Sequence, residues 1–174
     1  MYQAPARADG KHLEYVELFN TNPWQEDIGG YQLAGDITYT FPIGITIAGG
    51  GFVVVGKAPA DLQSVYGLKD VLGPFENAPL VTGILQLLNN GTTPAVYLEV
   101  PYLSLGPWTV AAHGTGYSLV LKRPSYGEGF VEAWGVSELL GGSPGAMETY
   151  IPSPLRSVAM NEFLAHPGDA VHDL

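Results

Sequence analysis

The stretch DIGGYQLAGDITYTFPIGITIAGGGFVVVGK, residues 27–57, decides the fold expected of this chain. Tyr31–Leu33 and Tyr39–Phe41 are predicted as short strands, because each is a brief apolar and aromatic segment bounded by turn-forming residues. Phe52–Val55 is a continuous aromatic and β-branched run, which is typical of a strand covered on both faces. A glycine-rich link precedes it, and we expect Ile47 in this link to point inward.

The segments on either side extend the same pattern. LEYVELFN, residues 13–20, reads as a strand that enters the stretch. After it, Ala58–Tyr66 is the one predicted helix, since Pro59 suits a first turn and Gly67 suits a helix end. Further strands are predicted at Leu85–Leu88, Ala95–Val100 and Tyr117–Leu121. Many short strands joined by tight turns favour an all-β sandwich with one short helix near residues 58–66.

Composition limits the function classes. The chain has 174 residues, 46% of them hydrophobic and 14% charged, which is enough for one domain with a sizeable core. Its formal net charge of −10 disfavours nucleic acid, whose phosphates require clustered Lys and Arg. There are no cysteines, which excludes disulfides and thiolate metal sites. No apolar run reaches the length of a membrane span, so we expect no membrane insertion.

One motif imitates a catalytic site. Gly141–Gly145, GGSPG, matches the G-x-S-x-G pattern of a serine hydrolase. The residue after the serine must donate its N–H to the oxyanion, and here that residue is Pro144, which has no N–H. We therefore interpret GGSPG as a turn and predict that the chain is not an enzyme and uses no cofactor.

Two ligand sites remain as alternatives. Trp24 and Trp108 are candidates for a carbohydrate platform, because aromatic rings stack on sugars. Acidic pairs such as Glu26–Asp27 are candidate calcium ligands, although no D-x-D-x-D-G loop accompanies them. Core packing for the tryptophans and solvated loop charge for the acids are the favoured interpretations.

An ordered set of motifs resembles the lamin tail domain, an immunoglobulin-like sandwich found in nuclear lamins and in bacterial surface and secreted proteins. EYVELFN at 14–20 is similar to that family's "YIELYN" strand, and residues 27–57 follow its next segment almost step by step. Val71–Phe75 is similar to its "lGpF", and Gly116–Leu119 with the later Trp, Ser and GGSPG is similar to its closing motif. The resemblance covers residues 1–147.

The resemblance implies structural roles and no catalytic residues. It assigns such roles to a set of motif positions, namely Glu17, Asn20, Gly30, Phe41, Pro42 and Trp134. It also implies a non-catalytic adaptor of a larger bacterial surface or secreted protein, which binds, tethers or spaces other domains.

The end of the chain departs from the family's order. Lamin tail domains open with a strand written like "vviNEi", and residues 1–147 resemble one that lacks it. Residues 158–174 contain that element, with Asn161 and Glu162 in the matching positions. We expect residues 148–157 to be a proline-containing linker and residues 158–174 to be the first strand of a following copy. This strand would pair with the sandwich in its own chain or by exchange with a neighbour.

Overall fold

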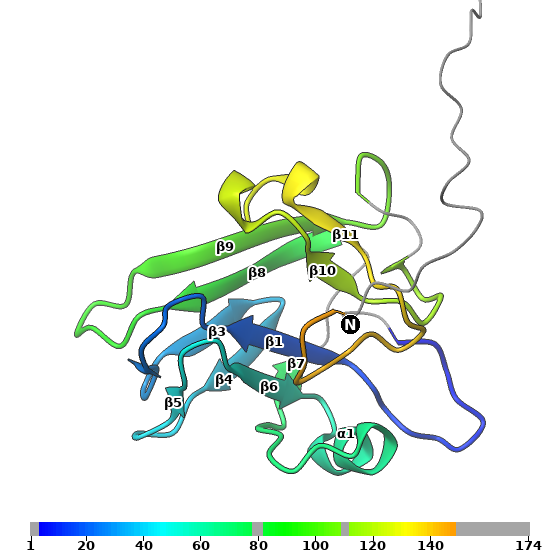
Figure 1. Ribbon diagram of the computed structural model, residues 1–174, viewed down its shortest axis with the longest axis horizontal. Coiled ribbons are helices and arrows are strands. Elements are labelled where there is room, and N and C mark those ends of the chain that lie inside the picture. Colours follow the sequence, from blue (N-terminus) through cyan, green and yellow to red (C-terminus); the bar gives the residue numbers. More distant parts are fainter. Residues whose placement is uncertain (1–3, 78–81, 109–111, 149–174) are drawn as a thin grey trace, which may run out of the picture.

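Short strands form the framework of the protein, as its period-2 and β-branched segments predict (Figure 1). The structure is a computed structural model, and it describes residues 4–77, 82–108 and 112–148. The strands are β1 (Tyr15–Phe19), β2 (Glu26–Asp27), β3 (Gln32–Gly35), β4 (Ile37–Thr40), β5 (Thr46–Ile47), β6 (Phe52–Gly56), β7 (Glu76–Asn77), β8 (Thr82–Leu88), β9 (Val96–Leu103), β10 (Leu119–Leu121) and β11 (Trp134–Val136). The helical elements are α1 (Pro59–Tyr66) and the short 3-10 helices η2 (Pro124–Tyr126) and η3 (Val131–Ala133). An all-β fold with one short α-helix is confirmed.

The strands pair into antiparallel sheets. The largest is five-stranded, in the order β7-β4-β3-β8-β9, and three two-stranded sheets join β1 to β6, β2 to β5 and β10 to β11. The β8–β9 ladder is the longest and contains an irregularity between Leu87 and Leu88. Among the described residues, no helix is long and apolar enough to cross a membrane.

The β1–β6 pair has hydrophobic side chains packed on both of its faces. On one face Val16, Leu18 and Val55 join the main core with buried residues of the five-stranded sheet. On the other face Tyr15 and Val54 pack with Leu62 of α1 in a second cluster. The continuous FVVV run therefore belongs to a strand covered on both faces, as predicted, and Ile47 is buried as expected.

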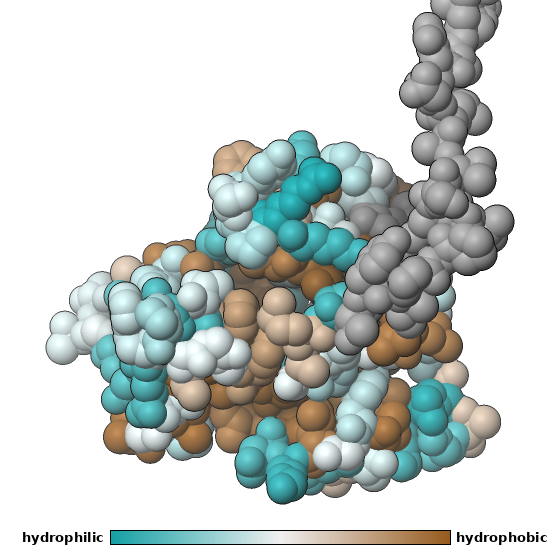
Figure 2. Space-filling view, viewed as in Figure 1, coloured by the Kyte–Doolittle hydropathy of each residue, from teal (hydrophilic) through white to brown (hydrophobic). Residues whose placement is uncertain are grey.

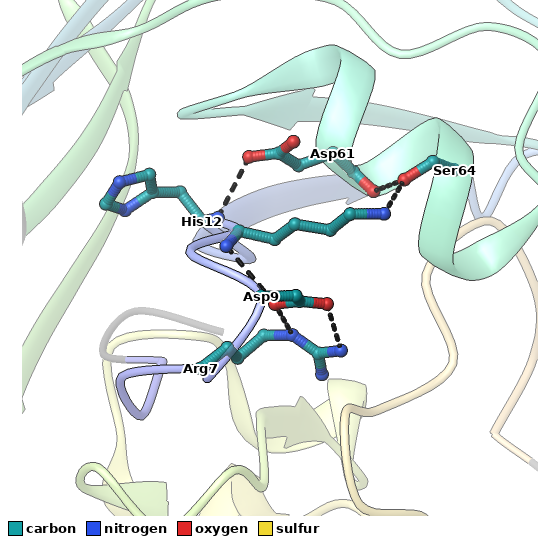
Figure 3. A network of polar contacts seen from close by, with 6 residues as sticks. Arg7, Asp9, His12, Asp61 and Ser64 are labelled. Carbon is teal, nitrogen blue, oxygen red and sulfur yellow. Dashed lines mark hydrogen bonds and ion pairs between the residues drawn. The ribbon is translucent and has the colours of Figure 1, made fainter.

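Helix α1 begins and ends where its sequence predicts. Pro59 occupies the first turn, and Gly67 ends the helix in the left-handed conformation at φ 70°. The segment before β1 is fastened to this helix (Figure 3). The His12 N–H donates to the Asp61 carboxylate at 2.9 Å, and the Lys11 ammonium donates to the Ser64 hydroxyl at 2.5 Å. These contacts fix where the chain enters β1.

The predicted strands agree with the structure in place but differ in their ends. The strand predicted at residues 13–20 is the shorter β1, and those predicted at 85–88 and 95–100 are the longer β8 and β9. The linker at residues 148–157 lies outside the described residues except for Glu148, and residues 158–174 lie outside them entirely.

Candidate functional site: the outer edge of β1

Backbone hydrogen bonds show which groups of β1 face β6. The Lys57 N–H donates to the Glu14 carbonyl at 2.9 Å, and the Asn20 N–H donates to the Gly51 carbonyl at 3.0 Å. In an antiparallel pair, the residues that exchange such bonds alternate along the strand. Even-numbered residues of β1 therefore turn their backbone groups toward β6. The backbone groups of Glu17 and Phe19 point to the opposite side, which we call the outer edge of β1.

The outer edge carries no strand among the described residues. In that part of the chain β6 is the single strand paired with β1, and no backbone hydrogen bond reaches the N–H or C=O of Glu17 or Phe19. The aromatic ring of Phe19 stacks on Phe52 at a centroid distance of 4.7 Å and is still 41% exposed. Figure 2 shows hydrophobic residues in a recess of this face, between β1 and the β10–β11 pair.

The far edge of the five-stranded sheet is different. The Asp36 N–H donates to the Ile84 carbonyl at 3.0 Å, so the backbone groups of Ile84 face β3. Its partner across the ladder is Pro101, whose ring nitrogen therefore points out of the sheet and carries no hydrogen. Gly129 also passes beside this edge, since a side chain there would lie 3.7 Å from the Glu99 carbonyl oxygen. Proline and a covering segment are ordinary protections of an edge strand.

The GGSPG loop, residues 141–145, is anchored on β1. The Gly145 N–H donates to the Glu17 carboxylate, and the Tyr66 hydroxyl of α1 donates to the Gly141 carbonyl at 2.8 Å. Gly142 has φ 75°, and a side chain there would lie 2.4 Å from the Tyr15 hydroxyl. Glycine is required at this position because both the conformation and the space exclude a side chain.

A second carboxylate holds the end of this loop. The Ser143 hydroxyl donates to the Glu148 carboxylate at 3.0 Å, and the Glu138 N–H donates to its other oxygen. The pKa of Glu17 is raised to about 7, chiefly by burial and to a smaller extent by the Glu148 charge, against the opposing effect of the Gly145 N–H. Two carboxylates thus fasten the loop, and one of them, Glu17, holds it over a face of β1.

These contacts agree with a structural turn. Ser143 donates its hydroxyl to a carboxylate, and Pro144 places no N–H where an oxyanion would need one. The hydrolase pattern also requires a helix directly after the serine. Among the described residues, which continue to Glu148, no helix follows it.

The other predicted structural residues are dispersed through the fold. Asn20 is buried, and its amide donates to the carbonyls of Trp24 at 2.8 Å and Ile47 at 3.0 Å. Gly30, with φ 79°, donates its N–H to the carbonyl of Phe41 at 2.9 Å. Phe41 is a fully buried member of the main core.

Pro42 and Trp134 complete this set. Pro42 accepts a turn hydrogen bond from the Ile45 N–H at 3.3 Å. Trp134 donates its indole N–H to the Glu128 carbonyl at 2.8 Å. Asn161 and Glu162 lie outside the described residues, so their predicted role remains a prediction.

The two tryptophans of the candidate carbohydrate platform differ in exposure. Trp24 is 61% exposed, and its indole N–H donates to Glu26 at 2.7 Å. Trp108 is only 6% exposed and packs against Trp134, with ring centroids 6.3 Å apart. A ring this buried offers no face to a sugar. Among the described residues, no group of three or more His, Cys, Asp or Glu side chains is placed to hold a metal ion.

Sequence reasoning identified Glu17 but not its partners. The Glu17–Gly145 contact joins residues 128 positions apart, and neither Glu148 nor the outer edge carries a local sequence signal. No protein-family model matches the chain, and a search of curated proteins found no match.

Proposed function

We propose that this chain is a non-catalytic, immunoglobulin-like interaction module of a larger bacterial surface or secreted protein. In this proposal the module tethers or spaces other domains, and it does so by accepting a β-strand at the outer edge of β1. The observation that carries the proposal is the set of backbone groups on Glu17 and Phe19, which have no backbone partner among the described residues.

Strand addition is the recognition mode that fits such an edge. An incoming strand gains affinity from main-chain hydrogen bonds and specificity from pockets for alternate side chains. The outer edge supplies the main-chain groups, while the exposed Phe19 ring and the neighbouring hydrophobic recess supply an apolar surface. The contrast with β9 strengthens the proposal, because Pro101 removes a donor there, and β1 contains no proline and pairs with no second strand among the described residues.

The resemblance to lamin tail domains supports the same function. In this proposal residues 1–147 are a domain similar to the members of a non-catalytic family. An extracellular or cell-surface location follows from the same resemblance. The net charge of −10 favours a neutral or basic protein partner over nucleic acid or an anionic membrane.

Two sources of the added strand fit the sequence. One is the chain's own segment 158–164, and the other is the same segment of a neighbouring copy, which would give a strand-exchanged assembly. With either source of the strand, the proposal keeps other domains of the parent protein as binding partners.

The proposal is tested by selecting extended peptides from a phage-displayed library against the whole chain. The same selection is made against a variant with Met160→Pro and Phe163→Pro, which removes the strand-forming capacity of the C-terminal segment. Bound peptides should shift the NMR signals of the Glu17 and Phe19 amides. The Glu99 amide, on the outer edge of β9, is the matched control and should not move.

Chemically modified peptides then distinguish strand addition from binding through side chains alone. N-methylation of alternate peptide amides should abolish binding in one register and leave it intact in the other, because only every second N–H faces the edge. Selection of no peptide by either protein, or shifts confined to β9, would contradict the proposal.

A further inference from the structure

We infer that Tyr126, Phe130 and Glu132 form a binding site for a quaternary ammonium group, such as the trimethylammonium group of choline. These three residues line one open hollow on the surface of the protein. None of them belongs to β1 or to the GGSPG loop bonded to it, so the inference goes beyond the proposed function and does not depend on strand addition.

A series of short turns brings the two aromatic residues together. The 3-10 helix η2 ends at Gly127, whose N–H donates to the Pro124 carbonyl at 3.0 Å, and the Phe130 N–H then donates to the Gly127 carbonyl at 3.2 Å. Gly127 has φ 84°, and a side chain there would lie 3.6 Å from the Phe130 ring. The Phe130 ring therefore packs over the backbone that directly follows Tyr126.

Further contacts fix this loop to the body of the protein. The Ala133 N–H donates to the Phe130 carbonyl at 3.0 Å, and Ala133 is fully buried. The Trp134 indole N–H donates to the Glu128 carbonyl at 2.8 Å. Figure 1 shows the loop and its two short 3-10 helices, in yellow tones, beside β9. Because the backbone is already held in this way, little ordering of the loop has to accompany the binding of a ligand.

The three side chains have the chemistry that an ammonium cation requires. Tyr126 and Phe130 are both more than half exposed, and Glu132 is exposed beside them. Exposed apolar residues that are scattered singly are normal on a protein surface, but here two rings and a carboxylate line the same hollow. The face of an aromatic ring is electronegative and attracts a cation within about 6 Å of its centroid. The Glu132 carboxylate adds a full negative charge.

The Tyr126 ring already attracts a cation of the chain itself. The guanidinium carbon of Arg123 lies 5.6 Å from the centroid of this ring, and Arg123 does not line the hollow. The formal net charge of −10 also favours a positively charged ligand. A sugar would need hydrogen-bond partners for many hydroxyl groups, whereas a trimethylammonium group needs none. Two rings and one carboxylate therefore suit the ammonium group better.

NMR titration of the whole chain with choline chloride, at constant ionic strength, tests the site. The amides of Gly127, Phe130 and Glu132 should shift with a dissociation constant in the millimolar range, because cation–π contacts at exposed sites are weak. Dimethylbutanol is the isostere of choline in which an uncharged carbon replaces the nitrogen, and it should bind about 5-fold more weakly or less. Equal binding of the two compounds, or no shift with choline, would overturn the inference.

Variants at exposed positions locate the binding site. Phe130→Leu and Glu132→Gln should each weaken choline binding by about 3-fold or more. Tyr97→Leu and Glu76→Gln are the matched controls, since they remove a ring or a carboxylate at exposed positions outside the hollow, and they should bind choline like the wild type. Losses of the same size in the controls and in the site variants would overturn the assignment.

Arg123→Gln distinguishes a cation site from a site for anions or sugars. It removes a positive charge that competes for the Tyr126 ring, so choline binding should become roughly 2-fold tighter. Loss of choline binding in this variant would overturn the cation site. The same conclusion would follow if glucose or galactose shifted these amides and choline did not.

Two carriers of the trimethylammonium group are then compared, namely phosphocholine and the amide of trimethyllysine. The acidic chain should favour trimethyllysine, because phosphocholine also carries a negatively charged phosphate. Binding of either compound that weakens in Phe130→Leu supports the site, and the tighter one identifies the carrier. Binding of neither would overturn the inference.

Discussion

At the scale of single residues, the fold disfavours the ionised form of the Glu17 side chain. Its carboxylate lies on the face of β1 that the GGSPG loop covers, where it accepts the backbone N–H of Gly145. Burial and the nearby Glu148 charge outweigh that hydrogen bond, so the pKa of Glu17 rises to about 7. The protonated form of Glu17 is thus the one that suits the folded state best.

The first prediction concerns the pH dependence of stability. Between the usual pKa of 4.5 and about 7, the folded chain binds a proton at Glu17 that the unfolded chain has lost. The free energy of unfolding should therefore fall as pH rises through this window and level off above it. Glu17→Gln keeps the acceptor and removes the titration, so at pH 8 it should stabilise the chain by about 1–2 kcal/mol, after allowance for solvent screening.

Urea unfolding at a series of pH values measures this effect. Below the window, wild type and Glu17→Gln should have nearly the same stability. Glu76→Gln, on the exposed strand β7, is the control and should leave the pH dependence unchanged. An identical slope in wild type and Glu17→Gln would contradict the assignment.

At the scale of elements, strands with a continuous apolar pattern were predictable from the sequence. β6 and β8 contain the short apolar runs that are typical of buried strands. Helix α1 is bounded by Pro59 and Gly67. The two-residue strands β2, β5 and β7 were not predicted, because two residues show no period. They exist because tertiary pairing supplies them with partners.

The candidate site was predictable only in part. The resemblance marked Glu17 and Asn20 as structural, but the outer edge follows from the register of β1 on β6, which no local pattern specifies. The contacts of Glu148 with Ser143 and Glu138 depend on how the loop closes. The buried position of Trp108 agrees with the favoured interpretation of core packing, but its contact with Trp134 could not be read from a local pattern.

A second prediction concerns the protected edge of the five-stranded sheet. Pro101→Val restores an N–H that points out of β9 and improves the β-propensity of the strand. Stability should change by no more than about 0.5 kcal/mol, while the chain should begin to self-associate through the newly completed edge. Sedimentation equilibrium measures the loss of monomer.

Pro94→Val supplies the matched control for this experiment. Pro94 is exposed in the turn between β8 and β9, outside both strands, so its replacement should leave the chain monomeric. Equal association by the two variants would show that Pro101 has no protective role.

At the scale of the whole molecule, the β1–β6 pair couples two hydrophobic clusters. Val16, Leu18 and Val55 belong to the main core, and Tyr15 and Val54 of the same strands belong to the cluster around α1. Neither cluster can be lost without removing support from one face of these two strands. We therefore expect the described domain to unfold as one cooperative unit.

The third prediction tests whether the domain unfolds as one unit, and it uses two residues that are close in sequence. Phe41 is 1% exposed in the main core, whereas Ile43 is 88% exposed in the turn that follows β4. Phe41→Ala should lower the free energy of unfolding by about 3–5 kcal/mol, because it removes buried contacts and leaves a cavity. Ile43→Ala should change it by no more than about 0.5 kcal/mol.

Two probes report whether the loss reaches the whole domain. Far-ultraviolet circular dichroism follows the strands. In a Trp24→Phe background, tryptophan fluorescence follows Trp108 and Trp134, which pack together. The main core around Phe41 includes neither Trp108 nor Trp134 among the described residues, so a shared shift of both transitions requires cooperative unfolding. Phe41→Ala should move the two unfolding curves together. A fluorescence transition that stays at its wild-type midpoint would show instead that the region around β10 and β11 unfolds independently of the main core.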